Sequence, residues 1–306
     1  MEEGRTEVIR NDRVKAGGKV VNSGRKVQTI AEDEDEDRSV PKYVARYAPY
    51  TLGFYGYIPA DAPELPAYKV EQYDKKAASY WHGFYQNNKA NFFKDRHWLT
   101  REFPALADKE GGQKVVVELG CGVGNTIFPL LKENAHLFFY GLDFAPSAIE
   151  LVKSNPEYDE SRCQAFVCDI TEDSAWPSQI KDNSVDLVTM IFVLSAISPE
   201  RMANVVRNIA RILKPGGVVL FRDYAVGDMA QKRFEKVEGQ KKLGLNFHVR
   251  GDGTRAYYFS KEFTAELWGE MGFALDENDY CQRVVTNRKQ QVDLNRLFLQ
   301  GKYRKQ

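Results

Sequence analysis

Apolar and polar positions alternate along this chain in a pattern that predicts strands separated by helices. The first strand starts at Val115-Val116-Val117, a run that suits burial on both faces of a parallel sheet. Four further short apolar runs follow, at residues 137–143, 165–170, 185–194 and 218–224. Because helical periodicity separates these runs, the pattern predicts an α/β doubly wound fold.

Two helix starts are visible between the predicted strands. Pro146 begins a helix that ends near Lys153, and Ser198-Pro199-Glu200 begins another with Ser198 as its N-cap. Six residues of the second helix form one apolar stripe at helical spacing, and we assign them to the core. They are Met202, Val205, Val206, Ile209, Ile212 and Leu213.

The last third of the chain predicts two helices and two closing strands. The helices cover residues 228–242 and 261–271, and the strands cover 279–288 and 293–304. An antiparallel pair at the sheet edge completes a seven-stranded, mostly parallel sheet with an antiparallel C-terminal strand. Residues 281–306 are strongly basic, which suits either binding of nucleic-acid phosphates or a solvated sheet edge.

The N-terminal part differs in composition and predicts separate units. Residues 1–40 lack apolar periodicity and contain an acidic run, so we expect a disordered tail. Residues 41–110 form an N-terminal extension, with helical periodicity from about Ala67 to Asn88. The aromatic-rich stretch at 41–66 favours a packing strap, with base stacking as the alternative. Residues 111–306 contain the predicted sheet and form the main domain.

Charge and cysteine usage limit the possible functions. Among 306 residues the formal net charge is zero, so nucleic-acid binding must depend on local patches. The four cysteines form no CxxC pair and no Cys/His metal spacing, which predicts reduced thiols and no metal. Without a signal peptide or an apolar run of membrane-spanning length, we expect a cytoplasmic protein, with the nucleus as the alternative.

A glycine-rich turn follows the first strand and indicates a nucleotide-like ligand. Gly120, Gly122 and Gly124 let the backbone turn tightly and approach a ligand closely. Asp143 ends the second strand about twenty residues later, where an acid can bind ribose hydroxyls. These features suit a dinucleotide as well as S-adenosylmethionine.

Three details favour S-adenosylmethionine. The turn reads Gly-x-Gly-x-Gly after Glu118, without the pyrophosphate spacing of dinucleotide sites. Asp169-Ile170 ends the third strand and offers an acceptor for the adenine amino group beside an apolar cover. Lys214-Pro215-Gly216-Gly217 resembles the junction before the fifth strand of class I methyltransferases. A sheet that binds no nucleotide is the alternative.

Residues 91–103 interleave cations with aromatic rings. Cations bind phosphates and rings stack on bases, as a single-stranded nucleic-acid site requires. A half-buried amphipathic segment explains the composition equally well, and His97 could be purely structural. The predicted contacts are Phe92, Phe93, Lys94, Arg96, His97, Trp98 and Arg101.

Several strings together resemble the tRNA 3-methylcytidine methyltransferases, a class I, Rossmann-like family. The most specific string is Phe92-Phe93-Lys94-Asp95-Arg96-His97-Trp98, and the resemblance covers residues 67–306. The other strings are Tyr80-Trp81-His82-Gly83-Phe84-Tyr85 and residues 118–125, 191–197, 221–224, 249–257 and 287–289. His248 departs from the tyrosine that we expect there.

The resemblance implies that S-adenosylmethionine is the cofactor and that cytidine 32 of a tRNA anticodon loop is methylated. Threonine, serine or arginine acceptors are the implied substrates, a seryl-tRNA synthetase is an implied partner of some relatives, and a monomer is expected. The implied cofactor contacts are Trp81, Tyr85, Gly120, Asp143, Asp169, Ile170 and Ile191, to which the glycine turn adds Gly122. A core contact between Trp81 and Tyr85 is the alternative for that pair.

Methylation of cytosine N3 needs no general base, because the nitrogen already carries an in-plane lone pair. Asp223, with its neighbour Arg222, is our candidate for stabilising the cationic product, and a salt bridge to Arg222 or Arg250 is the alternative. The remaining predicted tRNA contacts are Arg250, Arg255, Arg288 and Lys289. Methylation of a protein or small molecule, and an inactive tRNA-binding scaffold, are the competing functions.

Overall fold

The computed structural model describes residues 65–90, 92–110, 112–236, 242–287 and 292–306. The predicted tail at 1–40 and most of the aromatic stretch at 41–66 lie outside the described residues. Arg288 and Lys289 also lie outside them.

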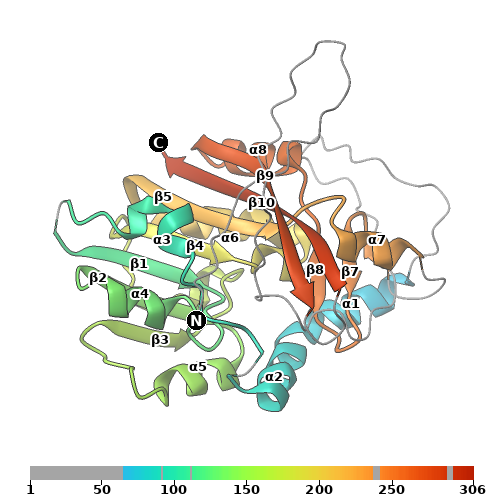
Figure 1. Ribbon diagram of the computed structural model, residues 1–306, viewed down its shortest axis with the longest axis horizontal. Helices are drawn as coiled ribbons and strands as arrows, with labels where there is room; N and C mark the ends of the chain where they lie inside the picture. Colours follow the sequence, from blue (N-terminus) through green and yellow to red (C-terminus); the bar gives the residue numbers. More distant parts are fainter. Residues whose placement is uncertain (1–64, 91, 111, 237–241, 288–291) are drawn as a thin grey trace, which may run out of the picture.

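The described chain contains one seven-stranded sheet, in the order β3-β2-β1-β4-β5-β10-β9 (Figure 1). Its strands are β1 (Lys114–Leu119), β2 (Leu137–Asp143), β3 (Cys163–Val167), β4 (Val185–Ile191), β5 (Leu213–Tyr224), β9 (Phe273–Asn287) and β10 (Val292–Lys305). Among the described strands of this sheet, β10 runs in the direction opposite to the other six. The predicted α/β fold with a seven-stranded, mostly parallel sheet is confirmed.

Helices cover both faces of this sheet because its strands are apolar on both sides. Val116 belongs to the cluster that contacts α3 (Leu99–Glu102), α4 (Ile127–Glu133) and α5 (Pro146–Lys153). The next residue, Val117, belongs to the opposite cluster, with α6 (Pro199–Ile212) and α8 (Lys261–Glu270). Successive side chains of a strand point to opposite faces, so the valine run at 115–117 supplies both cores.

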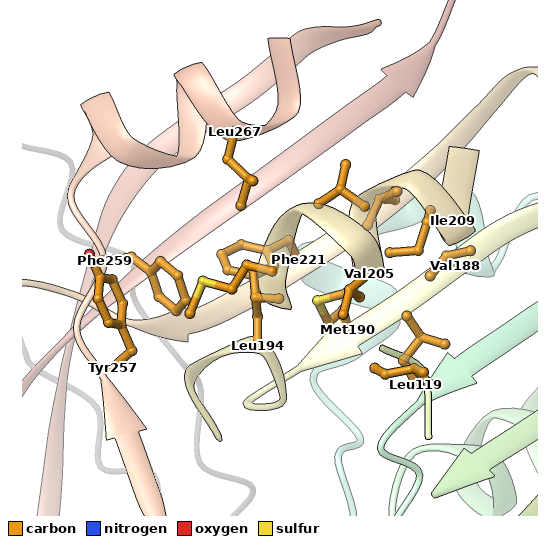
Figure 2. Close-up of a cluster of buried hydrophobic side chains, with 14 of the residues drawn as sticks. Leu119, Val188, Met190, Leu194, Val205, Ile209, Phe221, Tyr257, Phe259 and Leu267 are labelled. Atoms are coloured by element: carbon orange, nitrogen blue, oxygen red, sulfur yellow. The ribbon is translucent and has the colours of Figure 1, made fainter. Parts of the chain in front are cut away.

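The predicted apolar stripe of α6 is confirmed, since all its members are fully buried. Figure 2 shows Val205 and Ile209 beside Val188 and Met190 of the sheet, with Leu267 reaching in from α8. Ser198 occupies the predicted N-cap position of α6, but it does not cap the helix through its side chain. Its hydroxyl makes no cap hydrogen bond and instead contacts two distant side chains that are described below.

Two predicted helices have different bounds in the structure, and one small sheet was not predicted. The helix at 67–88 is two helices, α1 (Ala67–Lys75) and α2 (Ala77–Asn88). Within the predicted helix at 228–242, the described residues form α7 (Met229–Lys236), and Lys242 already belongs to a strand. The segment after α7 forms a small antiparallel sheet of β6 (Lys242–Gly244), β7 (Phe247–Val249) and β8 (Arg255–Tyr257). Short 3-10 turns cover Pro104–Leu106, Asp173–Ala175 and Leu194–Ala196.

The small sheet lies beside α1 and α2 at one end of the large sheet (Figure 1). The backbone N–H of Leu65 donates to the carbonyl of Lys242 at 3.1 Å. The ring of Tyr80 lies so close to Gly253 that a Cβ there would be 2.3 Å from it. Within the described part of the chain, no helix combines the length and the apolar composition that crossing a bilayer requires.

A buried charge cluster attaches the N-terminal extension to the last strands. Glu102 of α3 accepts hydrogen bonds at 3.0 Å from Arg222 of β5 and forms an ion pair at 3.0 Å with Arg283 of β9. The guanidinium of Arg222 also lies 4.0 Å from the ring centre of Trp98. Since removing one partner of a buried ion pair leaves an uncompensated charge, Glu102 should be essential to this contact.

We expect Glu102→Gln to destabilise the protein by about 3–5 kcal/mol, because two buried arginines lose their shared carboxylate. Chemical denaturation measures the loss, and the exposed Glu110→Gln serves as the control with an unchanged free energy of unfolding. Equal stability of the two variants would contradict this account of the cluster.

Candidate active site

A cavity of about 350 Å³ lies at the carboxyl ends of the parallel strands. This volume suits a small-molecule ligand, and ligands of doubly wound sheets bind at this edge. The sheet contributes Gly120 after β1, Asp143 at the end of β2 and Asp169 after β3. Helix α2 contributes Trp81 and Tyr85.

The glycine turn is shaped by two close approaches. Gly120 has φ +57°, and a Cβ there would lie 2.6 Å from a methyl group of Val193. Gly122 has φ +53°, and a Cβ there would lie 2.8 Å from the hydroxyl of Tyr85. Positive φ is strained for residues with a side chain, so both positions need glycine for conformation and for space.

Asp143 fixes the turn from the neighbouring strand. Its carboxylate accepts the N–H of Gly122 at 3.0 Å and the N–H of Ala145 at 2.9 Å. Burial raises the pKa of Asp143 to about 6, although these two hydrogen bonds lower it. A carboxylate has about four acceptor sites. Asp143 therefore keeps capacity for donors of a ligand in the cavity.

Trp81 and Tyr85 lie one turn apart on α2, with ring centres 5.9 Å apart. Tyr85 is buried and Trp81 is half-buried. Both rings line the large cavity, as the helical spacing predicted they could. The same pair also lines the smaller cavity described next.

Asp169 and Ile170 stand at the other end of the large cavity. Asp169 accepts the backbone N–H of Thr171 at 2.9 Å and its hydroxyl at 2.7 Å, which orients the carboxylate. Ile170 is 7% exposed, and its carbonyl accepts the side-chain amide of Asn208 at 3.2 Å. An oriented acid beside an apolar side chain can recognise and cover a heterocycle.

A second cavity of about 40 Å³ adjoins the first across the glycine turn. It shares Trp81, Tyr85, Gly120, Phe192, Ala196 and Arg255 with the large cavity. The residues that it adds are Phe93, Arg96, Cys121, Gly122, Asn125, Ile191, Ser195, Tyr224 and Arg250. Predicted cofactor and substrate residues therefore meet around these two spaces.

Phe192 forms part of the wall between the cavities and was not identified from the sequence. Its φ of +60° is unusual for a bulky side chain. The backbone N–H donates to the carbonyl of Arg222 at 2.8 Å, and the ring lies 5.1 Å from that of Tyr224. Contacts on both sides hold this conformation, and no sequence pattern predicts it.

Arg96 is the residue of the strip at 91–103 that points most clearly into the site. Its guanidinium donates to the hydroxyl of Thr126 at 2.9 Å and lies 3.6 Å from Glu118. Its backbone N–H donates to the carbonyl of Asn125 at 2.9 Å. Burial raises the pKa of Glu118 to about 7, although the charge of Arg96 lowers it. Arg96 is thus fixed to the glycine turn.

The other members of the strip have different surroundings. Phe93 lines the small cavity, while Phe92 packs edge-on against Phe84 at 4.7 Å. Trp98 is buried under Arg222, so the structure does not support it as an exposed stacking platform. The remaining cations lie on the surface: His97 beside Glu133, Arg101 beside Glu102, and Lys94.

The two predicted catalytic residues do not line either cavity in the described chain. Arg222 pairs with Glu102, which replaces the predicted alternative of a salt bridge to Asp223. Asp223 is fully buried and accepts the N–H groups of Ser195 and Tyr224, each at 2.9 Å. Burial raises the pKa of Asp223 to about 7. Asp223 thus supports Ser195 and Tyr224 of the cavity wall from behind.

The basic C-terminal stretch is largely neutralised by partners. Arg283 and Arg296 are buried and pair with Glu102 and Asp228. Lys302 pairs with Glu277 at 2.7 Å, and Arg304 pairs with Asp276. Its described arginines thus do not form the phosphate surface that composition suggested, because their partners come from distant parts of the chain.

A family model and a solved structure agree with the fold described above. A family model described as a methyltransferase domain matches residues 117–219. The 1,6-didemethyltoxoflavin-N1-methyltransferase of Burkholderia thailandensis, solved with S-adenosylhomocysteine, superposes with a TM-score of 0.51. It is 17% identical, with 81% of this chain and 93% of that chain covered, and shares the fold.

Three relatives carry names that state a substrate. Mouse tRNA N(3)-cytidine methyltransferase METTL6 is 46% identical over 248 residues, which cover 80% of this chain and 86% of the mouse protein. Zebrafish METTL2, of the same description, is 42% identical and covers 79% and 77%. The tRNA(Thr) (cytosine(32)-N(3))-methyltransferase of Saccharomyces cerevisiae is 41% identical and covers 78% and 38%. The chain belongs to the tRNA N(3)-cytidine methyltransferase family.

Proposed function

We propose that this protein transfers the methyl group of S-adenosylmethionine to N3 of cytidine 32 in a tRNA anticodon loop. The observation that carries the proposal is the pair of adjoining cavities, a large one at the glycine turn and a small one with rings and arginines. The yeast relative is named for cytosine 32, which supports the position. Membership of the family supports the tRNA substrate over a protein, a small molecule or an inactive scaffold.

The large cavity has suitable groups for each part of the cofactor. Asp169 would accept the adenine amino group while Ile170 covers the ring, and Asp143 would accept the ribose hydroxyls with its remaining acceptor sites. The methionine part would lie along Gly120, which lines both cavities, and would extend toward Gly122 and Ile191 in the wall of the small cavity. Trp81 and Tyr85 would close over it from α2. Bound there, S-adenosylmethionine supplies an electrophilic methyl sulfonium.

The small cavity would receive the target cytosine. A base in an anticodon loop must leave its stack to reach a buried methyl donor. Phe93 and Tyr224 are the two rings that line only this cavity, and they could stack on the base. Arg96 and Arg250 are cations in the same wall. The exposed Lys94, His97 and Arg101 would contact phosphates farther out, and Phe92 would support Phe93.

The methyl transfer requires the protein to position the two reactants, and its attacking step requires no proton transfer. The lone pair of N3 attacks the methyl carbon in line, the carbon–sulfur bond breaks, and positive charge moves to the base. Proximity, orientation and exclusion of water supply the acceleration. Asp223 would act as a positioning residue through Ser195 and Tyr224, and Arg222 would hold the N-terminal extension in place through Glu102.

Finer aspects of the function belong to the same proposal. Threonine, serine or arginine tRNAs are the proposed substrates, and a seryl-tRNA synthetase is a proposed activator of a monomeric enzyme. Four buried free thiols support a reducing compartment, the cytoplasm. Contacts of Arg288 and Lys289 with tRNA are also proposed, and both residues lie outside the described part of the chain. Arg255 is buried against Asp74 and Ser198, so it is not included among the proposed tRNA contacts.

The function is tested by incubating the protein with labelled S-adenosylmethionine and total tRNA, followed by nucleoside analysis. We expect labelled 3-methylcytidine. Adding cell extract tests for a protein activator, and sequencing the tRNA locates the modified nucleotide. Absence of 3-methylcytidine with and without extract would refute the function.

The pH dependence of cofactor binding tests Asp143. Its pKa of about 6 means that the carboxyl is neutral below that pH and anionic above it. Since the anion is the better acceptor for ribose hydroxyls, we expect affinity to rise about tenfold from about pH 5 to about pH 7. Calorimetry measures this rise, and Asp143→Asn should bind weakly at every pH.

The raised pKa of Asp143 also makes the stability of the free protein depend on pH, in the opposite direction to the cofactor affinity. Burial favours the neutral acid in the folded state, so the free protein loses stability as the pH rises from the ordinary pKa of 3.8 to the folded-state pKa of about 6. A gain in cofactor affinity from about pH 5 to about pH 7 therefore comes from ionisation of Asp143 and not from a more stable protein. A flat binding profile in the wild type would argue against the ribose contact.

The glycine turn can be tested by adding one methyl group. Gly120→Ala should weaken cofactor binding by about tenfold or more, because positive φ and the contact with Val193 both disfavour the new side chain. Gly83→Ala on α2 is the matched control, since nothing lies within 4 Å of its Cβ. If calorimetry gives both variants the wild-type affinity, the close approach is unimportant for binding.

A further inference from the structure

Three side chains from distant parts of the sequence meet at the edge of the large cavity. Asp74 belongs to α1, Ser198 precedes α6, and Arg255 begins β8. Arg255 donates hydrogen bonds to the Asp74 carboxylate and to the Ser198 hydroxyl, the latter at 2.7 Å. The Ser198 hydroxyl donates to the same carboxylate oxygen. This contact also explains why the Ser198 hydroxyl makes no cap hydrogen bond to the first turn of α6.

Asp74 and Arg255 depend on each other electrostatically. The side chain of Arg255 is 6% exposed, and its ion-pair partner among the described residues is Asp74. Burial raises the pKa of Asp74, but hydrogen bonds from Ser198 and Arg255 outweigh it and hold the pKa below its ordinary value. Asp74 is therefore ionised at neutral pH, and separating the pair leaves a buried arginine without its carboxylate.

The ion pair lies where α1 reaches over the cofactor cavity. Asp74 and Arg255 both line the large cavity, and Arg255 also lines the small one. Two other contacts join the same segments, the Leu65 hydrogen bond to Lys242 and the packing of Tyr80 on Gly253. All three connect the N-terminal helices to the small sheet, and the ion pair is the one with opposite charges.

We propose that Asp74 is a positioning residue whose ion pair with Arg255 holds α1 and α2 closed over the cofactor. The inference rests on the proposed function, because the cavity must bind S-adenosylmethionine for closure to affect activity. Trp81 and Tyr85 follow Asp74 along the same pair of helices and would move with it. Asp74 itself needs no contact with the reacting atoms.

The inference predicts a specific division between binding and turnover. If Asp74→Ala lowers the closed fraction of the free protein to about a tenth, the Kd and KM for S-adenosylmethionine rise about tenfold. Saturating cofactor restores closure, so kcat with saturating tRNA should stay within about twofold of the wild type. A residue with a purely catalytic role would lower kcat instead.

The experiment compares Asp74→Ala with Glu71→Ala, a control one turn earlier on α1. Glu71 is exposed and pairs with Lys75 at 2.6 Å on its own helix. Calorimetry gives the Kd for S-adenosylmethionine, and methylation kinetics give KM and kcat. Hydrogen–deuterium exchange of the free protein reports opening directly, and we expect faster exchange in α1 and α2 for Asp74→Ala alone.

Two outcomes would overturn the inference. One is an unchanged Kd in Asp74→Ala with unchanged exchange in α1 and α2. The other is lower stability of the whole protein at unchanged Kd, which would make the ion pair a general structural contact. Failure of the wild type to bind S-adenosylmethionine would count against the proposed function, and exchange would then still decide whether Asp74 holds the helices.

Discussion

The structure depends on how closely three segments approach one another at the glycine turn. Gly120 lies against Val193, and Gly122 lies against the hydroxyl of Tyr85, with no room for a side chain between them. These contacts fix the loop after β4 and the helix α2 relative to β1. Gly120 and Tyr85 line both cavities, so the relative position of the cavities follows from the backbone of the turn.

Buried ion pairs then orient the segments that the turn brings together. Glu102 holds arginines of β5 and β9, Asp74 holds Arg255, and Asp228 holds Arg296. Such pairs give little net stability over apolar packing, because desolvation offsets their attraction. Their effect here is to allow only one arrangement, since any shift would leave a buried charge alone.

The regular elements could be predicted from the sequence because their causes are local. The valine run of β1 and the stripe of α6 follow from periodicity, and the ends of the parallel strands located the cavity. The surroundings of Arg283, Ser198 and Trp98 could not be predicted, because their partners lie far away in the chain. The φ of Phe192 was equally inaccessible, since contacts on both sides of the ring impose it. Composition alone made the arginines of the last strands resemble a free phosphate surface.

The thiols near the cavities have a consequence for chemical labelling. Cys168 lies in the wall of the large cavity and Cys121 in that of the small one, and both are almost fully buried. Burial raises the pKa of each thiol, to about 12 for Cys168, so little reactive thiolate is present. Both thiols should therefore react slowly with alkylating reagents. The rate at which Cys121 and Cys168 are alkylated therefore reports how accessible the walls of the two cavities are.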